Sequence, residues 1–168
     1  MADATHERIA RLWKRTLADD WLADSTTGNL RNIVQGDVPA LAGLFFQAFL
    51  GTIDDGGQTE AQYVSKTTAI LGGRYGQWVP AASWAVEGAS GLRSACIVCD
   101  YKPYDCPVIA VVATMPACKR LSDAGTLLDA AMHSLRILGH LECCAMITSG
   151  NEASERLFAS RGFSPVAD

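Results

Sequence analysis

The sequence predicts an α/β fold in which a mixed central sheet is flanked by helices. The chain has 168 residues, which suits one domain with a sizeable core. In its second half a strand-like run (106–114), a run with helical spacing (124–138) and another strand-like run (141–148) follow one another. This alternation is typical of a βαβ crossover within one sheet.

The first expected element is a helix over residues 5–23. The apolar residues of this segment follow a helical stripe, namely Ile9, Leu12, Trp13, Leu17 and Trp21. We therefore interpret residues 1–28 as an N-terminal amphipathic helix extension and residues 29–168 as the main domain. The tryptophans of the stripe would be buried either on the chain's own domain or against a second subunit, which would make the protein a homodimer.

The remaining elements follow from periodicity and turn residues. Strands are expected at 30–34, 81–87, 92–99, 106–114 and 141–148, with a short extended tail at 163–166. Helices are expected from Asp37 to Phe49 and at 59–71, 124–138 and 151–161. Asp37 and Asn151 are the expected N-caps of the first and last of these helices. Glycines and aspartates predict a flexible loop at 51–58.

Composition excludes several classes of protein. Apolar residues make up 49% of the chain and charged residues 19%, as in an ordinary soluble globular domain. The net charge of −4 argues against a nucleic-acid-binding surface, but a small anion needs only a local positive pocket. No apolar stretch approaches the roughly 18–20 residues that span a bilayer, and the N-terminus lacks the apolar core of a signal peptide. We therefore expect a cytoplasmic protein with no membrane or nucleic-acid partner.

Six cysteines raise the question of a disulfide framework or a metal site. Cys96 and Cys99 form a CxxC, but they lie in a predicted strand, where positions three apart point to opposite faces. The adjacent Cys143 and Cys144 have the same difficulty. We expect reduced, structural thiols and no metal, and a thiol or metal module is the less favoured reading.

Two cations stand where the strand 106–114 ends and the next helix begins. The stretch 112–128 reads VATMPACKRLSDAGTLL, with Lys119 and Arg120 just before the helix. The first amides of a helix lack intrahelical acceptors and lie at the positive end of its dipole, so this place suits a phosphate. The stretch is equally consistent with a helix capped by Ser122 or Asp123 whose neighbouring cations are solvated.

The same stretch resembles the acetyl-coenzyme A loop of the GNAT superfamily, the general amine N-acetyltransferases. That pattern runs V-x-P-x-x-[RQ]-G-x-G-[IV]-[GA]-x-x-L-[LM]. Its matching positions here are Pro116, Lys119, Ala124, Leu127 and Leu128. Arg120 and Ser122 replace two of its glycines, and Asp123 occupies an aliphatic position beside the expected pyrophosphate.

A second stretch, NEASERLFASRGF (151–163), resembles the N-x-x-A-x-x-L-Y-x-x-x-G-F segment of the same superfamily. Its matching positions are Asn151, Leu157, Gly162 and Phe163. Phe158 stands where the family often has a tyrosine, and Ser154 takes the place of the alanine. The distance from Pro116 to Asn151 leaves room for one helix and one strand, as that fold requires.

The resemblance implies a GNAT-type mixed sheet and acetyl-CoA as cosubstrate, without a metal. The residues expected to bind the cofactor are Ala113, Thr114, Met115, Lys119, Arg120, Leu121, Ser122, Asp123, Ala124, Gly125, Asn151 and Phe158. It implies an N-acetyltransferase that moves an acetyl group to a primary amine of a small molecule or peptide by direct attack in a ternary complex. The alternative is a non-catalytic acyl-CoA-binding GNAT-like sensor or assembly domain, which the replaced glycines and Phe158 favour.

The catalytic groups are less defined by the sequence. The family's tyrosine protonates the departing thiolate, and Phe158 has no proton to donate. Glu87 and Glu142 are the expected catalytic carboxylates, chosen by position, with Asp105 and His140 as further choices. The pair Asp54-Asp55 lies in the connection that GNAT folds use to shape the acceptor site, where it would suit a cationic amine or form a solvated turn. Further candidates that we judge to be surface residues are His133, Tyr75, Tyr101 and Tyr104.

Overall fold

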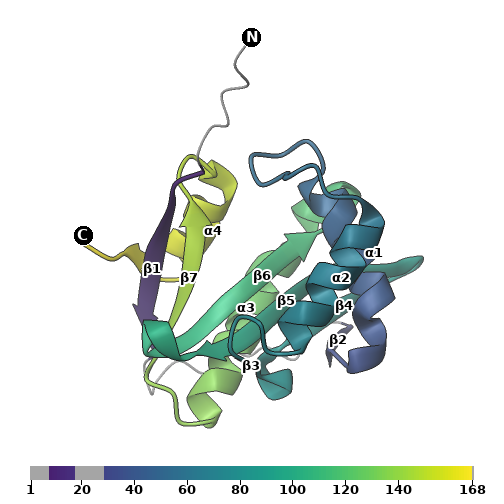
Figure 1. Ribbon diagram of the computed structural model, residues 1–168. Coiled ribbons are helices and arrows are strands. Elements are labelled where there is room, and N and C mark those ends of the chain that lie inside the picture. Colours follow the sequence, from purple (N-terminus) through teal and green to yellow (C-terminus); the bar gives the residue numbers. More distant parts are fainter. Residues whose placement is uncertain (1–7, 18–28, 168) are drawn as a thin grey trace.

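The computed structural model describes residues 8–17 and 29–167, which form one twisted sheet with helices on both faces (Figure 1). The sheet has 8 strands in the order β2-β4-β5-β6-β7-β1-β8, and β3 pairs with β5. Neighbouring strands are antiparallel except for β6 and β7, which are parallel. The strands are β1 (Ala10–Thr16), β2 (Leu30–Asn32), β3 (Gln77–Trp78), β4 (Trp84–Gly88), β5 (Gly91–Tyr101), β6 (Cys106–Thr114), β7 (Glu142–Thr148) and β8 (Ser164–Pro165). The helices are α1 (Val38–Phe49), α2 (Glu60–Leu71), α3 (Asp123–Ile137) and α4 (Glu152–Ser160).

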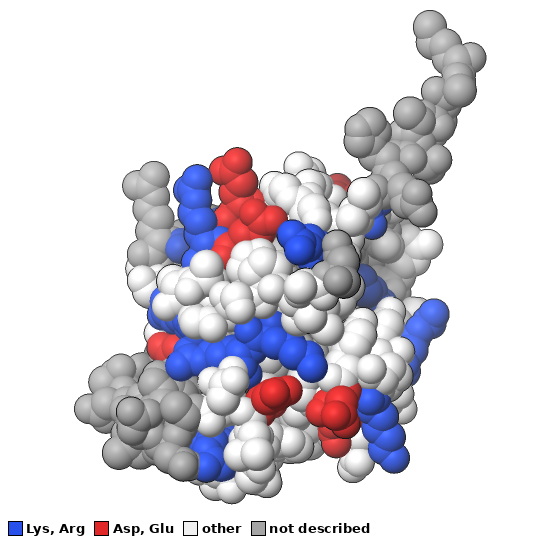
Figure 2. Space-filling model, turned by 90° about the vertical axis from the view of Figure 1, so that its left-hand side faces the viewer, with Lys and Arg blue, Asp and Glu red and all other residues white. Residues whose placement is uncertain are grey.

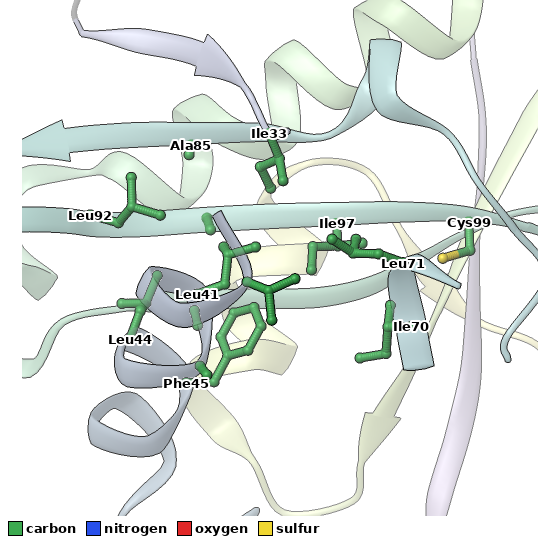
Figure 3. Close-up of a cluster of buried hydrophobic side chains, with 14 of the residues drawn as sticks. Ile33, Leu41, Leu44, Phe45, Ile70, Leu71, Ala85, Leu92, Ile97 and Cys99 are labelled. Carbon is green, nitrogen blue, oxygen red and sulfur yellow. The ribbon is translucent and has the colours of Figure 1, made fainter. Parts of the chain in front are cut away.

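The helices cover the sheet in two layers, each with its own hydrophobic cluster. Side chains of α1 and α2 such as Phe45 and Ile70 pack with Ile97 of β5 in the first cluster (Figure 3). Leu128 of α3 and Phe158 of α4 pack in the second cluster on the other face. Alternate residues of the central strands supply both clusters, since successive side chains of a strand point to opposite faces. The mixed α/β fold expected from the sequence is confirmed.

The predicted N-terminal helix is wrong where the structure describes it. Residues 10–16 form β1, which pairs with β7 from Ala10 to Thr16 and also with β8. Leu12 packs against the first cluster and Trp13 against the second, so the two faces of a strand bury them. An apolar pattern as short as this one, with the adjacent large residues Leu12 and Trp13, fits the period of a helix as well as that of a strand. Here the pairing with β7 determines which of the two forms. The rest of the predicted helix, including Trp21, lies outside the described residues.

The other expected elements occur, with local differences. The run expected as a strand at 81–87 begins with a 3₁₀ turn, Pro80–Ala82, before β4, and β3 was not expected. Asn151 caps α4 as predicted, because its side-chain oxygen accepts a hydrogen bond from the Ser154 amide at 3.1 Å. Asp37 precedes α1 but makes no side-chain cap. Its carboxylate instead accepts two hydrogen bonds of 2.8 Å from the Arg31 guanidinium.

The sheet consists of two arms. The inner arm is β2-β4-β5-β6 with β3, and the outer arm is β7-β1-β8. Within the described part of the chain, the two arms are joined where Val108 of β6 pairs with Cys144 of β7. The outer arm thus combines the N-terminal strand with strands from the end of the chain.

The outer arm exposes one edge of the molecule. Lys and Arg side chains form a band across the middle of this face (Figure 2). At the start of β7 the face holds a shallow depression of about 480 Å³, lined by Lys14, Arg15, Thr16, Glu142, Gly162 and Ser164. Across residues 8–17 and 29–167, no helix has the length and apolar character needed to cross a bilayer.

Candidate functional site

A split between β6 and β7 lies at the centre of the sheet. From the shared position at Val108 and Cys144, the two parallel strands run apart toward Thr114 and Thr148 (Figure 1). Beyond that position β6 is paired along one edge only, with β5. Backbone groups on its other edge therefore face the opening and are available to a ligand.

The backbone groups of β6 that face the split can be assigned from its pairing with β5. The Met115 amide donates to the Arg93 carbonyl at 2.8 Å, and the Ala113 carbonyl accepts from the Ser94 hydroxyl at 2.8 Å. Since successive amides of a strand point to opposite sides, those of Val112 and Thr114 point toward the split. Of the expected cofactor-binding residues on this stretch, Thr114 therefore turns its amide toward the split, whereas the Met115 amide is bonded to β5.

The turn from β6 into α3 leaves helix amides without helical acceptors. The chain passes through a 3₁₀ turn, η4 (Pro116–Leu121), and then Ser122, whose φ of 60° is left-handed. The first main-chain bond of α3 runs from the Thr126 amide to the Ser122 carbonyl at 3.2 Å, so the amides before Thr126 have no helical acceptor. Lys119 and Ser122 are exposed beside them. The motif's glycine position is thus a left-handed residue here, a conformation that glycine adopts at the least cost.

Asp123 does not place an unpaired charge beside these amides. Its carboxylate is 6% exposed and accepts two hydrogen bonds from the Arg93 guanidinium of β5, at 2.7 and 3.0 Å. These bonds raise the pKa of Arg93. The aspartate that the sequence places beside an expected diphosphate is therefore neutralised by a partner on β5, and the residues present fit an anionic group.

Arg161 is a cation near the start of α3 that the sequence reasoning missed. Its guanidinium lies so close to Gly125 that a Cβ there would clash with it. It also donates to Asp129 at 3.3 Å. Gly125 is therefore required for close approach. Arg161 precedes Gly162, a matching position of the second motif, and that motif was the available signal.

The two motif residues of α4 have other contacts in this structure. Both polar atoms of the Asn151 side chain are engaged, since its oxygen caps α4 and its nitrogen donates to Asp54 at 2.7 Å. Phe158 is 5% exposed and packs edge-on against Phe163, with ring centroids 5.0 Å apart. Their roles toward a cofactor stay predictions.

The two carboxylates expected to be catalytic lie away from the split. Glu87 is on β4, separated from β6 by β5, and pairs with Arg31 at 2.6 Å. Glu142 begins β7 at the end opposite Thr148 and lies 3.8 Å from Lys14. The ion-pair partners of these two carboxylates are Arg31 and Lys14, which belong to β2 and β1 and not to the start of α3. Their catalytic role stays an untested prediction.

Four of the remaining side chains singled out in the sequence lie at the other end of β6 and β7 from the split. Tyr101 and Tyr104 stack edge-on at 4.8 Å beside the β5–β6 connection, and Asp105 follows them in a left-handed conformation. His140 lies in the connection between α3 and β7, at the other end of β7. Asp54 alone among these candidates reaches the open end, where the Thr148 hydroxyl donates to it at 2.7 Å.

The cysteines have the alternating placement that the sequence predicts. Cys96 and Cys143 lie in the second cluster, and Cys99 and Cys144 lie in the first. Burial raises the pKa of the Cys99 thiol to about 11 and that of Cys143 to about 12. All six thiols are free, and only Cys118, on η4, is partly exposed. The buried thiols are therefore packing groups with low reactivity.

Comparisons with known proteins identify the fold. No family model matches the sequence, and no curated protein matches it. Solved structures do match, including a GCN5-related N-acetyltransferase from Sphaerobacter thermophilus with a TM-score of 0.68 and 17% identity. That match covers 95% of this chain and 49% of the other, so the chain spans about half of that protein's length.

Two further matches cover more of the other protein. The ribosomal-protein-S18-alanine N-acetyltransferase from Escherichia coli has a TM-score of 0.62 at 17% identity, with 82% of this chain and 78% of that chain covered. The protein yncA from Salmonella typhimurium, solved with its cofactor acetyl-CoA, has a TM-score of 0.61 at 22% identity, with 82% and 80% covered. The split sheet, the turn into α3 and these matches lead to one conclusion: the chain has the fold of the GNAT acetyltransferases.

Proposed function

We propose that this protein is an acetyl-CoA-dependent N-acetyltransferase that moves an acetyl group to a primary amine by direct attack in a ternary complex. The observation that carries the proposal is the β6–β7 split, which opens beside the start of α3. It offers unpaired strand amides and unpaired helix amides at one place. Acetyl-CoA suits both groups, since its diphosphate would bind the helix amides and its thioester carbonyl the strand amides.

The start of α3 supports the binding of a diphosphate. Its first amides and the exposed Lys119 provide positive potential, and the carboxylate of Asp123 is neutralised by Arg93. Arg120 belongs to the same turn by sequence. Ser122 takes the left-handed conformation without glycine, so its amide remains usable.

The edge of β6 supports the transfer itself. Acetyl-CoA, when bound, would supply an activated acetyl thioester. The amides of Val112 and Thr114 face the split and could donate to the carbonyl oxygen as negative charge develops on it. One preorganised donor of this kind is typically worth about 2.7–4 kcal/mol, and positioning of two reactants contributes about 7–11 kcal/mol.

A second candidate function is a non-catalytic acyl-CoA-binding domain. The observation that favours it is that the acid and bases expected from the sequence are absent from the described part of the split. Phe158 is buried in the second cluster, and Glu87 and Glu142 are engaged elsewhere. Transfer from a thioester to an amine can proceed by positioning and oxyanion stabilisation, so we favour the enzyme.

Calorimetric titration with acetyl-CoA, followed by thiol release in the presence of a panel of amines, tests the proposal. Saturable binding and amine-dependent release of coenzyme A are expected. Binding without amine-dependent release would support the second candidate, and no binding at millimolar acetyl-CoA would contradict both.

The half-buried thiol of Cys118 reports where the cofactor binds. It lies on η4, whereas the other five thiols are buried. Iodoacetamide should therefore modify Cys118 first, and acetyl-CoA should protect it. Binding that leaves the alkylation rate of Cys118 unchanged would place the cofactor elsewhere.

A further inference from the structure

Positive charge is concentrated on β1. Its sequence, ARLWKRT, contains three Lys or Arg residues in seven and no acidic residue, whereas the whole chain has a net charge of −4. Arg11 is exposed, and Lys14 and Arg15 are half-buried. β1 crosses the face of the outer arm that Figure 2 shows, so these three side chains contribute to its band of Lys and Arg, which we call the basic band.

The depression at the start of β7 is lined by two of these cations. Arg15 is fixed in the lining, because its guanidinium lies over Gly162, 3.2 Å from the place of a Cβ, and donates to the Arg161 carbonyl. The Lys14 ammonium lies 3.8 Å from Glu142, beyond hydrogen-bond distance. Its donors are therefore not used by the described residues and remain available to an anion in an opening of about 480 Å³.

The main chain of β1 adds a donor at the same place. The Leu17 amide donates to the Leu141 carbonyl of the turn before β7 at 2.8 Å, so the preceding amide, that of Thr16, points away from β7. On that side the pairing with β8 ends at Lys14 and Ser164, and the Thr16 amide lies beyond it. The hydroxyls of Thr16 and Ser164 line the depression as well. The depression thus combines charged, hydroxyl and main-chain donors.

The basic band is narrow. In Figure 2, Asp and Glu side chains lie above and below it. An extended peptide suits this shape, because neighbouring strands of a sheet are only about 4.8 Å apart. A nucleic-acid duplex, whose major groove alone is about 12 Å wide, and a bilayer surface would both extend over the flanking carboxylates and bring phosphates close to them. The charges of this face therefore favour a single acidic peptide segment.

We propose that the basic band is a docking site for an extended acidic segment of a partner protein, with one carboxylate of the segment in the depression beside Lys14 and Arg15. Alternate side chains of an extended segment point the same way, about 6.6 Å apart, so acidic residues at alternate positions meet successive cations of the band. Complementary charge of this kind steers association and sets specificity. The proposal is independent of the proposed function, since none of the three cations belongs to the turn into α3 or to the edge of β6.

The experiment measures the binding of fluorescein-labelled hexaglutamate to the full chain by fluorescence anisotropy, with hexaglutamine as the uncharged analogue. We expect the wild type to bind hexaglutamate more tightly than hexaglutamine. Raising the salt from about 0.1 M to about 1 M should abolish the difference, because the screening length falls from about 10 Å to about 3 Å. A DNA duplex and vesicles of phosphatidylcholine and phosphatidylserine are titrated in the same way.

Two double variants locate the binding surface. Arg11→Gln with Lys14→Gln should weaken hexaglutamate binding by about 2- to 30-fold, the range for two exposed ion pairs. Arg15 is kept, because it also supports the turn after α4. Lys66→Gln with Arg74→Gln is the matched control, since it removes two positive charges from exposed residues of α2 and of the turn after it. The control should bind hexaglutamate as the wild type does.

Several outcomes would overturn the proposal. They are equal affinity for hexaglutamate and hexaglutamine, an unchanged affinity in the β1 double variant, an equal loss in the control, and tighter binding of the duplex or of the vesicles than of hexaglutamate. Circular dichroism checks that each variant is folded. Should the double variant not fold, Arg11→Gln alone decides, because Arg11 has no hydrogen bond or ion pair with another described residue and its replacement removes only a surface charge.

Discussion

The two arms of the sheet are assembled from different parts of the chain. The inner arm and the start of α3 come from continuous sequence, and β4, β5 and β6 follow one another as neighbours. The outer arm combines β1 from one end of the chain with β7 and β8 from the other. The proposed cofactor site uses mainly the inner arm, whereas Asp54 of the loop between α1 and α2 is hydrogen-bonded to Thr148 and Asn151 of the outer arm and the turn after it.

The two arms also differ in how they are held in place. Main-chain pairing with β5 fixes β6 along its length, and the Arg93–Asp123 pair ties α3 to β5. Main-chain pairing joins the outer arm to the inner arm at one register position, and the other contacts between the arms are side-chain contacts, in the clusters and at Asp54. Changes in the inner arm should therefore affect global stability, and changes in the outer arm should act more locally.

Loss of the tie between α3 and β5 should have the largest effect. Arg93→Ala leaves the carboxylate of Asp123, whose side chain is 7% exposed, without its partner. The free energy of unfolding should fall in urea denaturation, because the remaining carboxylate is almost fully buried and has lost both of its hydrogen bonds to Arg93. Arg93→Ala combined with Asp123→Val should recover most of the loss. A double variant as unstable as the single one would contradict this account.

Leu17→Ala and Ile109→Ala test whether the outer arm opens separately. Leu17, just after β1, is 3% exposed, and Ile109, on β6, is 4% exposed, and both lie in the second cluster. The free energy of unfolding of each variant should be about 2–5 kcal/mol lower than that of the wild type. Amide exchange should rise mainly in β1 and β7 for Leu17→Ala, but in both arms for Ile109→Ala. The same exchange pattern in both variants would show that the arms unfold as one unit.

Charge reversal beside α3 should weaken acetyl-CoA binding without changing the fold. Lys119→Glu should reduce acetyl-CoA affinity by about 10- to 150-fold, the range for one hydrogen bond to a charged group, because it places a negative charge beside the diphosphate. Lys102→Glu, an exposed lysine beside the β5–β6 connection, is the control and should bind as wild type in calorimetric titration. Equal affinities for both variants would show that the diphosphate binds elsewhere.

The smallest expected effect is on the free energy of unfolding at acid pH, through Asp37 at the edge of the inner arm. The hydrogen bonds from Arg31 lower the pKa of Asp37 from its ordinary value of 3.8. A carboxylate with a lowered pKa stabilises the fold above that ordinary value, and this contribution is lost as the pH falls through the folded-state pKa. Below pH 3.8, Asp37→Asn should therefore lose unfolding free energy less steeply than wild type. Parallel curves in acid titrations followed by circular dichroism would contradict this.

Local signals predicted the inner arm and failed for the outer one. The apolar run of β6, the stripe of α3 and the Asn151 cap are written in neighbouring residues. Leu12 and Trp13 fit a helix as well as a strand, and only the distant β7 determines which one forms. Periodicity cannot contain that information, because the partner strand lies more than a hundred residues away.

The candidate site divides in the same way. The motif predicted the turn from β6 into α3 and the exposed Lys119. It could not predict that Arg93 neutralises Asp123, or that Arg161 lies against Gly125, since these contacts join separate elements. Glu87 and Glu142 were chosen by chain position, and strand order places them away from the split.

The position of β1 in the sequence also affects when the sheet can form during synthesis. On the ribosome, β1 is synthesised long before Glu142–Thr148, with which it pairs residue for residue. Until then Leu12 and Trp13 have no β7 to pair beside, so the nascent chain carries an unpaired, partly apolar strand while the residues between β1 and β7 are synthesised. Closure of the outer arm is therefore a late, long-range event, which favours slow folding and gives chaperones time to bind that strand.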